Sequence, residues 1–386
     1  MLDDLLCGVD RSKLRNDLIQ ATTIEFSDIA DWQSDDHSAA VCAFRRHSQK
    51  PSNHEYKKPR CGCDPSRLIR LVDAAKHVPD DQVSARTFFE TNFVPVCIDA
   101  TVKGHEEHSL VTAYFEPELQ ASSTPDEEFT VPIHARPKQL VDANYAPTGT
   151  VPDDYAFAWQ FDDGNFGEAP DRAAIYADAL DGVADVIAWL RDPIDAFFMH
   201  VQGCARLSMT DGSVGRVNYS AKTGHPFTAI GRVLIDQGNI EASNVSMKAI
   251  ADWLRANPEQ ARTVMSQNRS YIFFQMSTVE DPELGPVGAA KVQLTPHRSL
   301  AVDMRYHSFA TPIFVDASNV NGAPYRKLMI AQDTGTAIRG PSRGDLFCGS
   351  GDKAGRFASH VASPVKFTVL CPRDEVAEYV AKWNAS

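Results

Sequence analysis

The segments after residue 285 constrain the fold more than any other part of this sequence. Short runs of β-forming and apolar residues follow one another there: VGAAKVQL (287–294), SLAVDM (299–304), TPIFVDA (311–317), KLMIAQD (327–333) and VKFTVL (365–370). These runs do not alternate with long helical patterns, as the strands of a βαβ sheet would. The pattern therefore predicts a small β-barrel.

One more strand is expected at SLVTAYFEPELQA (109–121), where β-forming residues continue as far as Pro117. Proline has no N–H group to donate to a sheet, so the strand should end there. The C-terminal runs do not easily close a barrel alone. We therefore expect residues 109–116 to join them.

The middle of the chain is predicted to contain a hairpin and helices. MHVQGCARLSM (199–209) and VGRVNYS (214–220) flank Thr210-Asp211-Gly212-Ser213, and Asp-Gly is the preferred pair for a type I′ turn. Residues 246–267 predict two short helices, the first capped by Ser246 and the second begun by Asn257-Pro258.

Two other stretches have simpler patterns. A helical pattern with Ser66 as its N-cap follows the Pro-rich loop 51–65. Residues 121–170 are acidic and rich in turn residues, so we expect long connections there.

Composition excludes several classes of protein. The 386 residues allow two domains or one domain with a large insertion, and 43% hydrophobic content is ordinary for a globular protein. A net charge of -13 without any basic block argues against nucleic acid or an anionic membrane surface as the main partner. No apolar run is long enough to span a bilayer, and residues 1–18 lack the basic start of a secretory signal.

The eight cysteines are widely scattered, which is unlike a small disulfide-stapled scaffold. Cys61-Gly62-Cys63 is too closely spaced for a usual zinc knuckle, and no second pair follows. We therefore expect mainly structural roles for the cysteines and no metal.

Acidic residues at the ends of the predicted strands are the candidate chemistry. Asp333-Thr334-Gly335 follows an apolar strand, as the catalytic triplet of an aspartic protease does. A pepsin-like enzyme needs two such triplets, because its two carboxylates share one proton, and this chain has one. Asp345 and Asp303 also lie at or near strand ends, which is where clefts gather carboxylates.

The three aspartates together resemble the three-aspartate "3D" domain of the MltA-type lytic murein transglycosylases. Further segments, in the same order as in the family, resemble its other motifs: TAYFEP (112–117), DAFFMHVQG (195–203, a strand in our interpretation), YSAKTGH (219–225) and IGR (230–232). The similarity runs from roughly residue 88 to 372. Agreement over several separated motifs is much more specific than a single triplet.

The resemblance implies a mainly β protein with peripheral helices. A double-psi β-barrel would be assembled from residues 1–116 and 279–386, and a second, largely β domain would be inserted at 117–278, with a glycan groove between the two. It also implies cleavage of the β-1,4 bond between N-acetylmuramic acid and N-acetylglucosamine without water. The muramyl C6 hydroxyl attacks the anomeric carbon, which leaves a 1,6-anhydro end, and no cofactor is needed.

The resemblance also assigns roles to residues. Asp345 would act as the general acid and then as the general base. Asp333 would orient it and stabilise the oxocarbenium-like centre, and Asp303 would brace the barrel turn. The glycan would be bound by a larger set of residues: Thr112, Tyr114, Gln202, Gly203, Tyr219, Lys222, Gly335 and Thr336.

Other interpretations stay open. This chain departs from the family pattern at Ala113, Cys204, Ala205, Ala221 and Thr336, so one alternative is a peptidoglycan-binding protein with impaired catalysis. An aspartic protease is a weaker alternative. For the first interpretation we expect a monomer in the periplasm or at the outer membrane, acting on peptidoglycan strands and open to peripheral association with wall complexes.

Overall fold

The computed structural model describes residues 19–99, 109–153 and 155–385, and the chain forms two compact units. The insert unit consists of Glu116–Asp281 with Ser350–Asp352. The barrel unit consists of the described residues up to Phe115, of Pro282–Gly349 and of those from Lys353 onwards. No helix in these described ranges has both the length and the apolar character needed to cross a membrane. The prediction about residues 1–18 lies outside the described residues.

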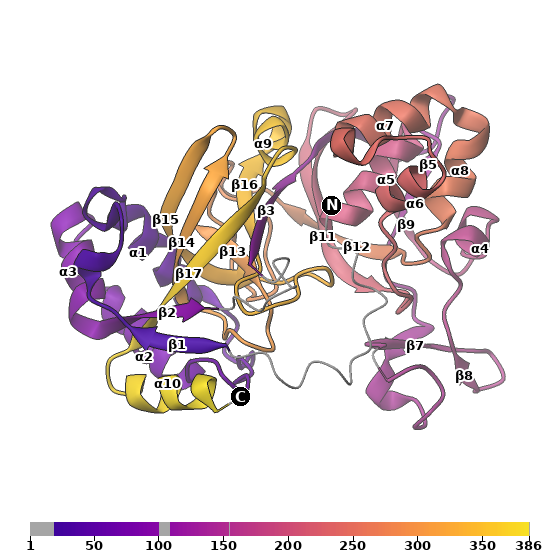
Figure 1. Cartoon of the computed structure of the whole chain (residues 1–386). Helices are drawn as coiled ribbons and strands as arrows, with labels where there is room; N and C mark the ends of the chain where they lie inside the picture. The colour runs from indigo at the N-terminus through magenta and orange to yellow at the C-terminus, as the bar shows by residue number, and fades with distance from the viewer. Residues whose placement is uncertain (1–18, 100–108, 154, 386) are drawn as a thin grey trace. The chain divides into compact units, whose positions relative to one another are not determined.

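The barrel unit is built on one sheet with the strand order β1-β2-β17-β14-β15-β13-β16-β3, in which β3 also pairs with β17. This additional pairing closes a ring of strands, as a barrel requires (Figure 1). The ring contains β3 (Leu110–Glu116), β13 (Ser299–Val302), β14 (Pro312–Val320), β15 (Ala323–Asp333), β16 (Gly344–Ser350) and β17 (Ala362–Pro372). The strand expected at 109–116 therefore does join the C-terminal strands, with Thr112 opposite Ala362.

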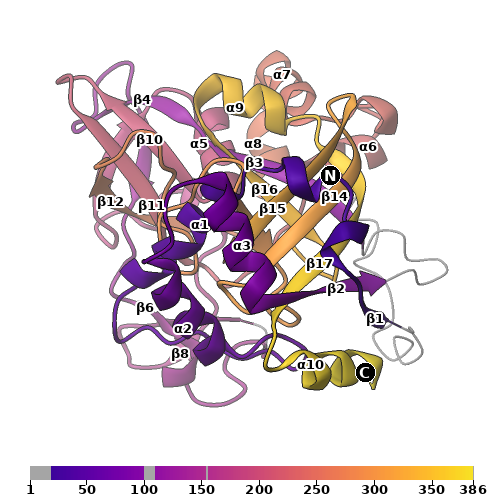
Figure 2. The ribbon, with the colours of Figure 1, turned by 90° about the vertical axis from the view of Figure 1, so that its left-hand side faces the viewer.

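Helices and two outer strands surround this ring. They are β1 (Gln20–Thr23), β2 (Phe93–Asp99), α1 (His37–Arg45), α2 (Pro65–Ala75), α3 (Gln82–Asn92), α9 (Gly351–Ala358) and α10 (Val376–Asn384). Helix α1 contacts β15, and α2 and α3 contact α1 (Figure 2). Large buried side chains such as Trp32, Phe44, Phe314 and Trp383 fill the core between these elements. The N-cap of α2 is Asp64 and not the predicted Ser66, because Pro65 occupies the first helical position.

The insert unit contains a six-stranded sheet with the order β12-β11-β10-β4-β9-β5 and a three-stranded sheet with the order β6-β7-β8. The larger sheet is formed by β4 (Glu118–Ser122), β5 (Val131–His134), β9 (Val186–Leu190), β10 (Cys204–Met209), β11 (Val214–Lys222) and β12 (Ile272–Thr278). The smaller sheet is formed by β6 (Leu140–Asp142), β7 (Phe157–Gln160) and β8 (Phe166–Gly167). The prediction that 121–170 consists only of connections is therefore wrong, because short strands form there.

Helices α4 (Arg172–Tyr176), α5 (Pro193–Gln202), α6 (Ile230–Asp236), α7 (Met247–Ala256) and α8 (Pro258–Ser266) complete the insert unit. The predicted cap of α7 and the predicted start of α8 are confirmed, since the Ser246 hydroxyl accepts a hydrogen bond from the Ala249 N–H and Pro258 begins α8.

The strand expected at 195–203 is wrong, because these residues form α5. Asp192 caps this helix and Pro193 begins it, and Gly203 ends it with a φ of 77°. The apolar residues of α5 contact both the sheet and the other helices. The helix therefore lacks the single apolar face by which a helix is recognised in a sequence. The hairpin itself is confirmed by the pairing of β10 with β11. Its turn is not of type I′, since Gly212 alone in the loop has a positive φ.

The strand expected at 287–294 is also wrong. These residues form a turn with a single isolated bridge between Val287 and Gln293, and Lys291 has a φ of 61°. This turn places the backbone of Gly288 and Ala289 beside the end of β15. It therefore contributes to the candidate site instead of the sheet.

Candidate active site

Strand pairing brings two of the three predicted aspartates to either side of one residue. Ala301 of β13 pairs with Asp333 of the parallel strand β15 and with Asp345 of the antiparallel strand β16. Neighbouring strands lie about 4.8 Å apart, so the two Cα atoms are roughly 10 Å apart, two strand spacings. The pairing of β13 with β15 shifts its register just before Ala301, so strand pairing alone does not fix the face of Asp333. Thr112 and Tyr114 are two residues apart on β3 and so point to one side of it. Their hydroxyls donate to Asp345 and Asp333 respectively, which places both carboxyl groups on that side.

Asp345 is half-buried near the start of β16, and a side chain from the N-terminal strand β3 holds it. The Thr112 hydroxyl donates a hydrogen bond of 2.6 Å to Asp345 Oδ1. Thr112 in turn accepts a hydrogen bond of 2.8 Å from the buried guanidinium of Arg343. Arg343 also donates to the carbonyl oxygens of Leu110 and Gly344. This chain of contacts fixes the Thr112 hydroxyl and, through it, the orientation of the Asp345 carboxyl group.

Asp333 ends β15 and is held from two directions. The Tyr114 hydroxyl donates to Asp333 Oδ2 at 2.7 Å, and the Ala289 N–H donates to Oδ1 at 2.9 Å. Burial raises the pKa of the Asp333 carboxyl above its ordinary value, and these hydrogen bonds offset part of that rise. The Tyr114 ring packs against Phe347 with 5.3 Å between ring centroids, which fixes the position of its hydroxyl.

Asp303 has a different environment, and its side chain is only 2% exposed. It accepts hydrogen bonds from the backbone and side chain of Arg305 and, at 2.8 Å, from the Gly340 N–H. Burial by itself would raise the pKa of Asp303, but these donors outweigh it and the pKa is lowered. Gly340 belongs to the loop between β15 and β16. The contacts therefore support the predicted role of Asp303 in bracing that loop.

The loop from Thr334 to Arg343 carries two further predicted residues, Gly335 and Thr336, and both are exposed. The Thr334 hydroxyl donates to the Val302 carbonyl at 2.8 Å, and His307 donates to the Pro341 carbonyl at 2.6 Å. The loop is thus tied near its start to the last residue of β13 and near its end to the chain that follows β13.

The remaining predicted residues belong to the insert unit. Gln202 ends α5 and is half-buried, and Gly203 follows it as the left-handed C-terminal residue. Tyr219 and Lys222 lie near the end of β11, and the Tyr219 side chain is 44% exposed beside a register shift in the pairing with β12. Tyr219 therefore presents an accessible aromatic side chain on the insert unit.

Sequence reasoning missed three contributors to the site. Arg343 was not among the predicted site residues, and Gly288 and Ala289 were assigned to a strand. A Cβ on Gly288 would lie 2.7 Å from the Gln332 carbonyl oxygen, so only glycine allows the turn to approach the end of β15. An isolated glycine inside an apolar run was the available signal for such a close approach.

These features define a class of two-unit β protein in which carboxyl groups stand at the ends of barrel strands and are oriented by hydrogen bonds. Two family models match this chain. Residues 110–275 match the MltA specific insert domain, and residues 298–371 match the 3D domain. The chain belongs to the MltA family, which confirms the resemblance seen in its motifs.

Solved structures are similar over nearly the whole chain. A membrane-bound lytic murein transglycosylase from Agrobacterium tumefaciens has a TM-score of 0.85 and 38% identity, over 93% of this chain and 99% of that chain. MltA from Neisseria gonorrhoeae has a TM-score of 0.75 and 28% identity, over 91% of this chain and 92% of that chain.

A curated relative matches a shorter region. Membrane-bound lytic murein transglycosylase A of Vibrio cholerae is 32% identical over 260 residues, which cover 65% of this chain and 62% of the relative. The match thus spans less than two thirds of that relative's length.

Proposed function

We propose that this chain is a peptidoglycan lytic transglycosylase. It would cleave the β-1,4 bond between N-acetylmuramic acid and N-acetylglucosamine and leave a 1,6-anhydromuramyl end. Membership of the MltA family supports the proposal, as does the similarity to a relative named as a lytic murein transglycosylase. The observation that carries it is the pair of hydrogen bonds from Thr112 to Asp345 and from Tyr114 to Asp333, because these two hydroxyls come from the same face of β3.

In this mechanism Asp345 serves twice. Its carboxyl group first protonates the glycosidic oxygen as the bond to the anomeric carbon breaks. The resulting carboxylate then takes the proton of the muramyl C6 hydroxyl as that oxygen bonds to the anomeric carbon. The proton that Asp345 gave is thereby returned, and no water is consumed. Thr112 supports both steps, because its hydroxyl holds Oδ1 of this carboxyl group at 2.6 Å.

Asp333 would stabilise the positive charge that develops at the anomeric carbon. The Tyr114 hydroxyl and the Ala289 N–H both donate to its oxygens, which is the arrangement that holds a carboxylate anion in place. Because burial raises its pKa, this group loses its charge at a higher pH than an ordinary aspartate. Activity that depends on the Asp333 anion should therefore fall in acid as this group becomes protonated.

The alternative of a glycan-binding protein without catalysis is less well supported. It was suggested by residues that depart from the family pattern, and three of these, Cys204, Ala205 and Ala221, are buried in the insert unit. Ala205 and Ala221 belong to hydrophobic clusters of that unit. Their side chains are therefore accommodated by packing. Among the residues that depart from the family pattern, only Thr336 is exposed. It lies on the loop between Asp333 and Asp345.

The cellular setting follows from the substrate. We propose that the protein acts as a monomer in the periplasm or at the outer membrane, where peptidoglycan strands are accessible. The relatives from Agrobacterium tumefaciens and Vibrio cholerae are named membrane-bound.

Mass spectrometry of digested sacculi tests this function. Purified peptidoglycan is incubated with the wild type, with Asp345→Asn and with Asp316→Asn. The last is a matched control, since Asp316 lies on β14 of the same unit and pairs with Arg326. The wild type and the control should release muropeptides lighter by one water than hydrolysed products. Asp345→Asn should lower the rate by about 10²–10⁴-fold or more.

Two outcomes would contradict the proposal. Products with ordinary reducing ends would identify a hydrolase, in which water takes the place of the C6 hydroxyl. Binding of the glycan by the wild type without any release of muropeptides would favour the binding protein.

A further inference from the structure

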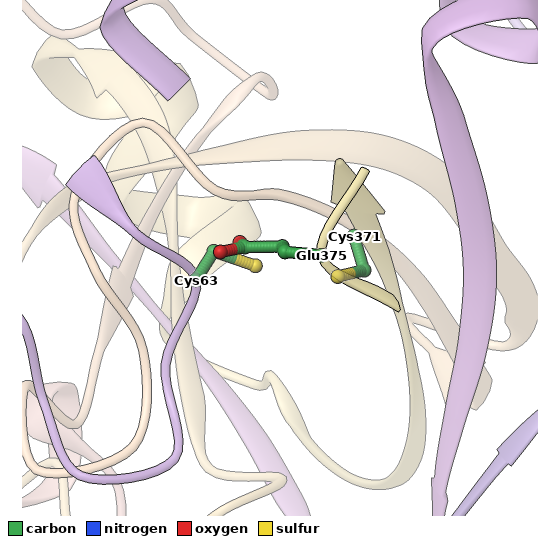
Figure 3. Close-up of side chains that lie close together, drawn as sticks. All are labelled: Cys63, Cys371 and Glu375. Carbon is green, nitrogen blue, oxygen red and sulfur yellow. The ribbon is translucent and has the colours of Figure 1, made fainter. Parts of the chain in front are cut away.

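Three chemically reactive side chains converge in the barrel unit away from the aspartates. Cys63 precedes α2, whereas Cys371 is the second-last residue of β17 and Glu375 precedes α10. Their two sulfur atoms and a carboxylate oxygen all lie within 4.8 Å of one another, and Figure 3 shows the three groups turned toward a common point. Their exposed fractions are 1%, 0% and 7%, so solvent hardly reaches them. Nothing in the proposed glycan chemistry uses this cluster.

The backbone around Cys63 is held tightly in place. A Cβ on Gly62 would lie 2.2 Å from the Pro59 ring, so glycine is required for this loop to pass so closely. The Ser308 hydroxyl donates to the Cys63 carbonyl oxygen, and the Asp64 N–H donates to Glu375 Oε1 at 2.9 Å. The cluster is therefore organised by contacts on both sides of Cys63.

Two further groups border the cluster. Cys61 is buried two residues before Cys63. The Tyr379 hydroxyl is also buried and finds no well-formed hydrogen bond among the described residues. Tyr379 lies one helical turn after Glu375, since its N–H donates to the Glu375 carbonyl oxygen at 2.9 Å at the start of α10. Such a concentration of polar atoms in a core is unusual without a ligand.

We propose that Cys63, Cys371 and Glu375 bind a zinc ion in a structural site. Thiolates with one carboxylate are a donor set that suits Zn²⁺. Zinc–sulfur bonds of about 2.3 Å in a tetrahedron place neighbouring ligand atoms about 3.7 Å apart. The side chains would therefore move inward slightly on binding, and each thiol would release its proton to solvent.

The charge of such a site is partly balanced. Arg67 Nε lies 3.6 Å from Glu375 Oε2, so a guanidinium offsets the negative charge of the thiolates and carboxylate. The bound ion would join the loop before α2 to the start of α10. It would thereby link segments that come from opposite ends of the chain but belong to one unit. Sequence reasoning rejected zinc because no second cysteine pair follows Cys61-Gly62-Cys63, and folding supplies the missing donors from the C-terminal segment.

Metal titration of the full chain tests the site. Reduced, chelator-treated protein is titrated with Zn²⁺ against a coloured chelator, and bound metal is counted by elemental mass spectrometry. Titration with Co²⁺ reports thiolate ligands through their charge-transfer absorption. The wild type should bind one ion per chain, and the midpoint of thermal unfolding should rise when zinc is added.

Variants separate ligation from folding. Cys63→Ser, Cys371→Ser and Glu375→Gln should each weaken binding at least tenfold. Cys97→Ser, which changes a half-buried thiol of β2 in the same unit, should bind like the wild type. Circular dichroism of each metal-free variant shows whether it is folded, and Glu375→Gln tests the site with both thiols intact.

Two results would overturn the proposal. One is a folded, reduced wild type that binds zinc no more tightly than Cys63→Ser. The other is a native protein lighter by two hydrogens in which Cys63 and Cys371 are recovered as one linked peptide, because a disulfide would then occupy the place of the metal.

Discussion

At the scale of single residues, Asp303 and Asp333 show how surroundings decide the chemistry of one residue type. Both are removed from solvent to some degree, which by itself raises the pKa of a carboxyl group. Asp303 is surrounded by donors from Arg305 and Gly340, and its pKa is lowered. The hydrogen bonds that Asp333 accepts from Tyr114 and Ala289 offset only part of the effect of burial, and its pKa is raised. The first environment suits a structural anion, and the second suits a group that takes part in catalysis.

These opposite shifts predict opposite effects on stability. The Asp303 anion stabilises the folded state above its ordinary pKa, and this contribution is lost as pH falls through its lowered pKa. Asp303→Asn should therefore reduce the free energy of unfolding at pH 7 by about 1–3 kcal/mol, and the difference should shrink in acid. Folding favours the protonated form of Asp333, so stability falls as pH rises through its raised pKa. Asp333→Asn should thus be at least as stable as the wild type at pH 7.

Urea denaturation of the wild type and both variants, at several values between pH 3 and pH 8, checks this prediction. The two substitutions are chemically identical, so each serves as the control for the other. Equal destabilisation by both at pH 7, without dependence on pH, would contradict the assignment of the two environments.

At the scale of elements, the turn around Gly288 matters more than its assignment as a strand suggested. It carries the Ala289 N–H that donates to Asp333, and it approaches β15 so closely that a Cβ at Gly288 would meet both a backbone oxygen and Leu294. An apolar run read from the sequence could not show this, because the same residues can line a sheet or fold back beside one. Helix α5 was misread for a related reason, since apolar residues contact neighbours on more than one side of it.

Gly288→Ala tests the importance of this turn. The added methyl group should displace the turn from the end of β15, weaken the bond from Ala289 to Asp333 and destabilise the protein by about 1–3 kcal/mol. If Asp333 acts as proposed, release of muropeptides should slow about tenfold or more, the rate cost of losing roughly 1.4 kcal/mol. The measurements are urea denaturation and the rate of muropeptide release. An unchanged rate in a destabilised variant would show that the turn supports only the fold.

At the scale of the whole molecule, the two units differ in how the chain builds them. Apart from Ser350–Asp352, the insert unit is one continuous stretch from Glu116 to Asp281. The barrel unit needs segments from both sides of that stretch, because β17 pairs with both β2 and β3. The buried Glu116, which pairs with Arg206 and Arg216, lies where the chain enters the insert unit.

This difference predicts how fragments behave. Residues 116–281 alone should unfold cooperatively, since their sheets, helices and the arginine partners of Glu116 are all present. Residues 282–386 alone should not, since β2 and β3 are missing and the edges of β16 and β17 would be left unpaired. Thermal unfolding followed by circular dichroism compares the two fragments. Cooperative folding of 282–386 by itself would refute the prediction.

Some properties of this protein follow from the sequence alone. Alternating apolar runs, caps such as Ser246 and Pro258, and the aspartates beside strand ends are local patterns. They were sufficient to indicate strands and helices, because propensity and periodicity act over a few neighbouring residues. The MltA family was indicated instead by the resemblance of several separated motifs, such as TAYFEP (112–117) and YSAKTGH (219–225).

Tertiary structure decided the rest. Three features depend on which distant segments pack together: the placement of Ala301 between Asp333 and Asp345, the bond from Thr112 to Asp345, and the meeting of Cys63 with Cys371 and Glu375. Such contacts are chosen by the packing of the entire core. Within the sheet, shifting β16 by a single residue would turn Asp345 to the opposite face, away from Thr112.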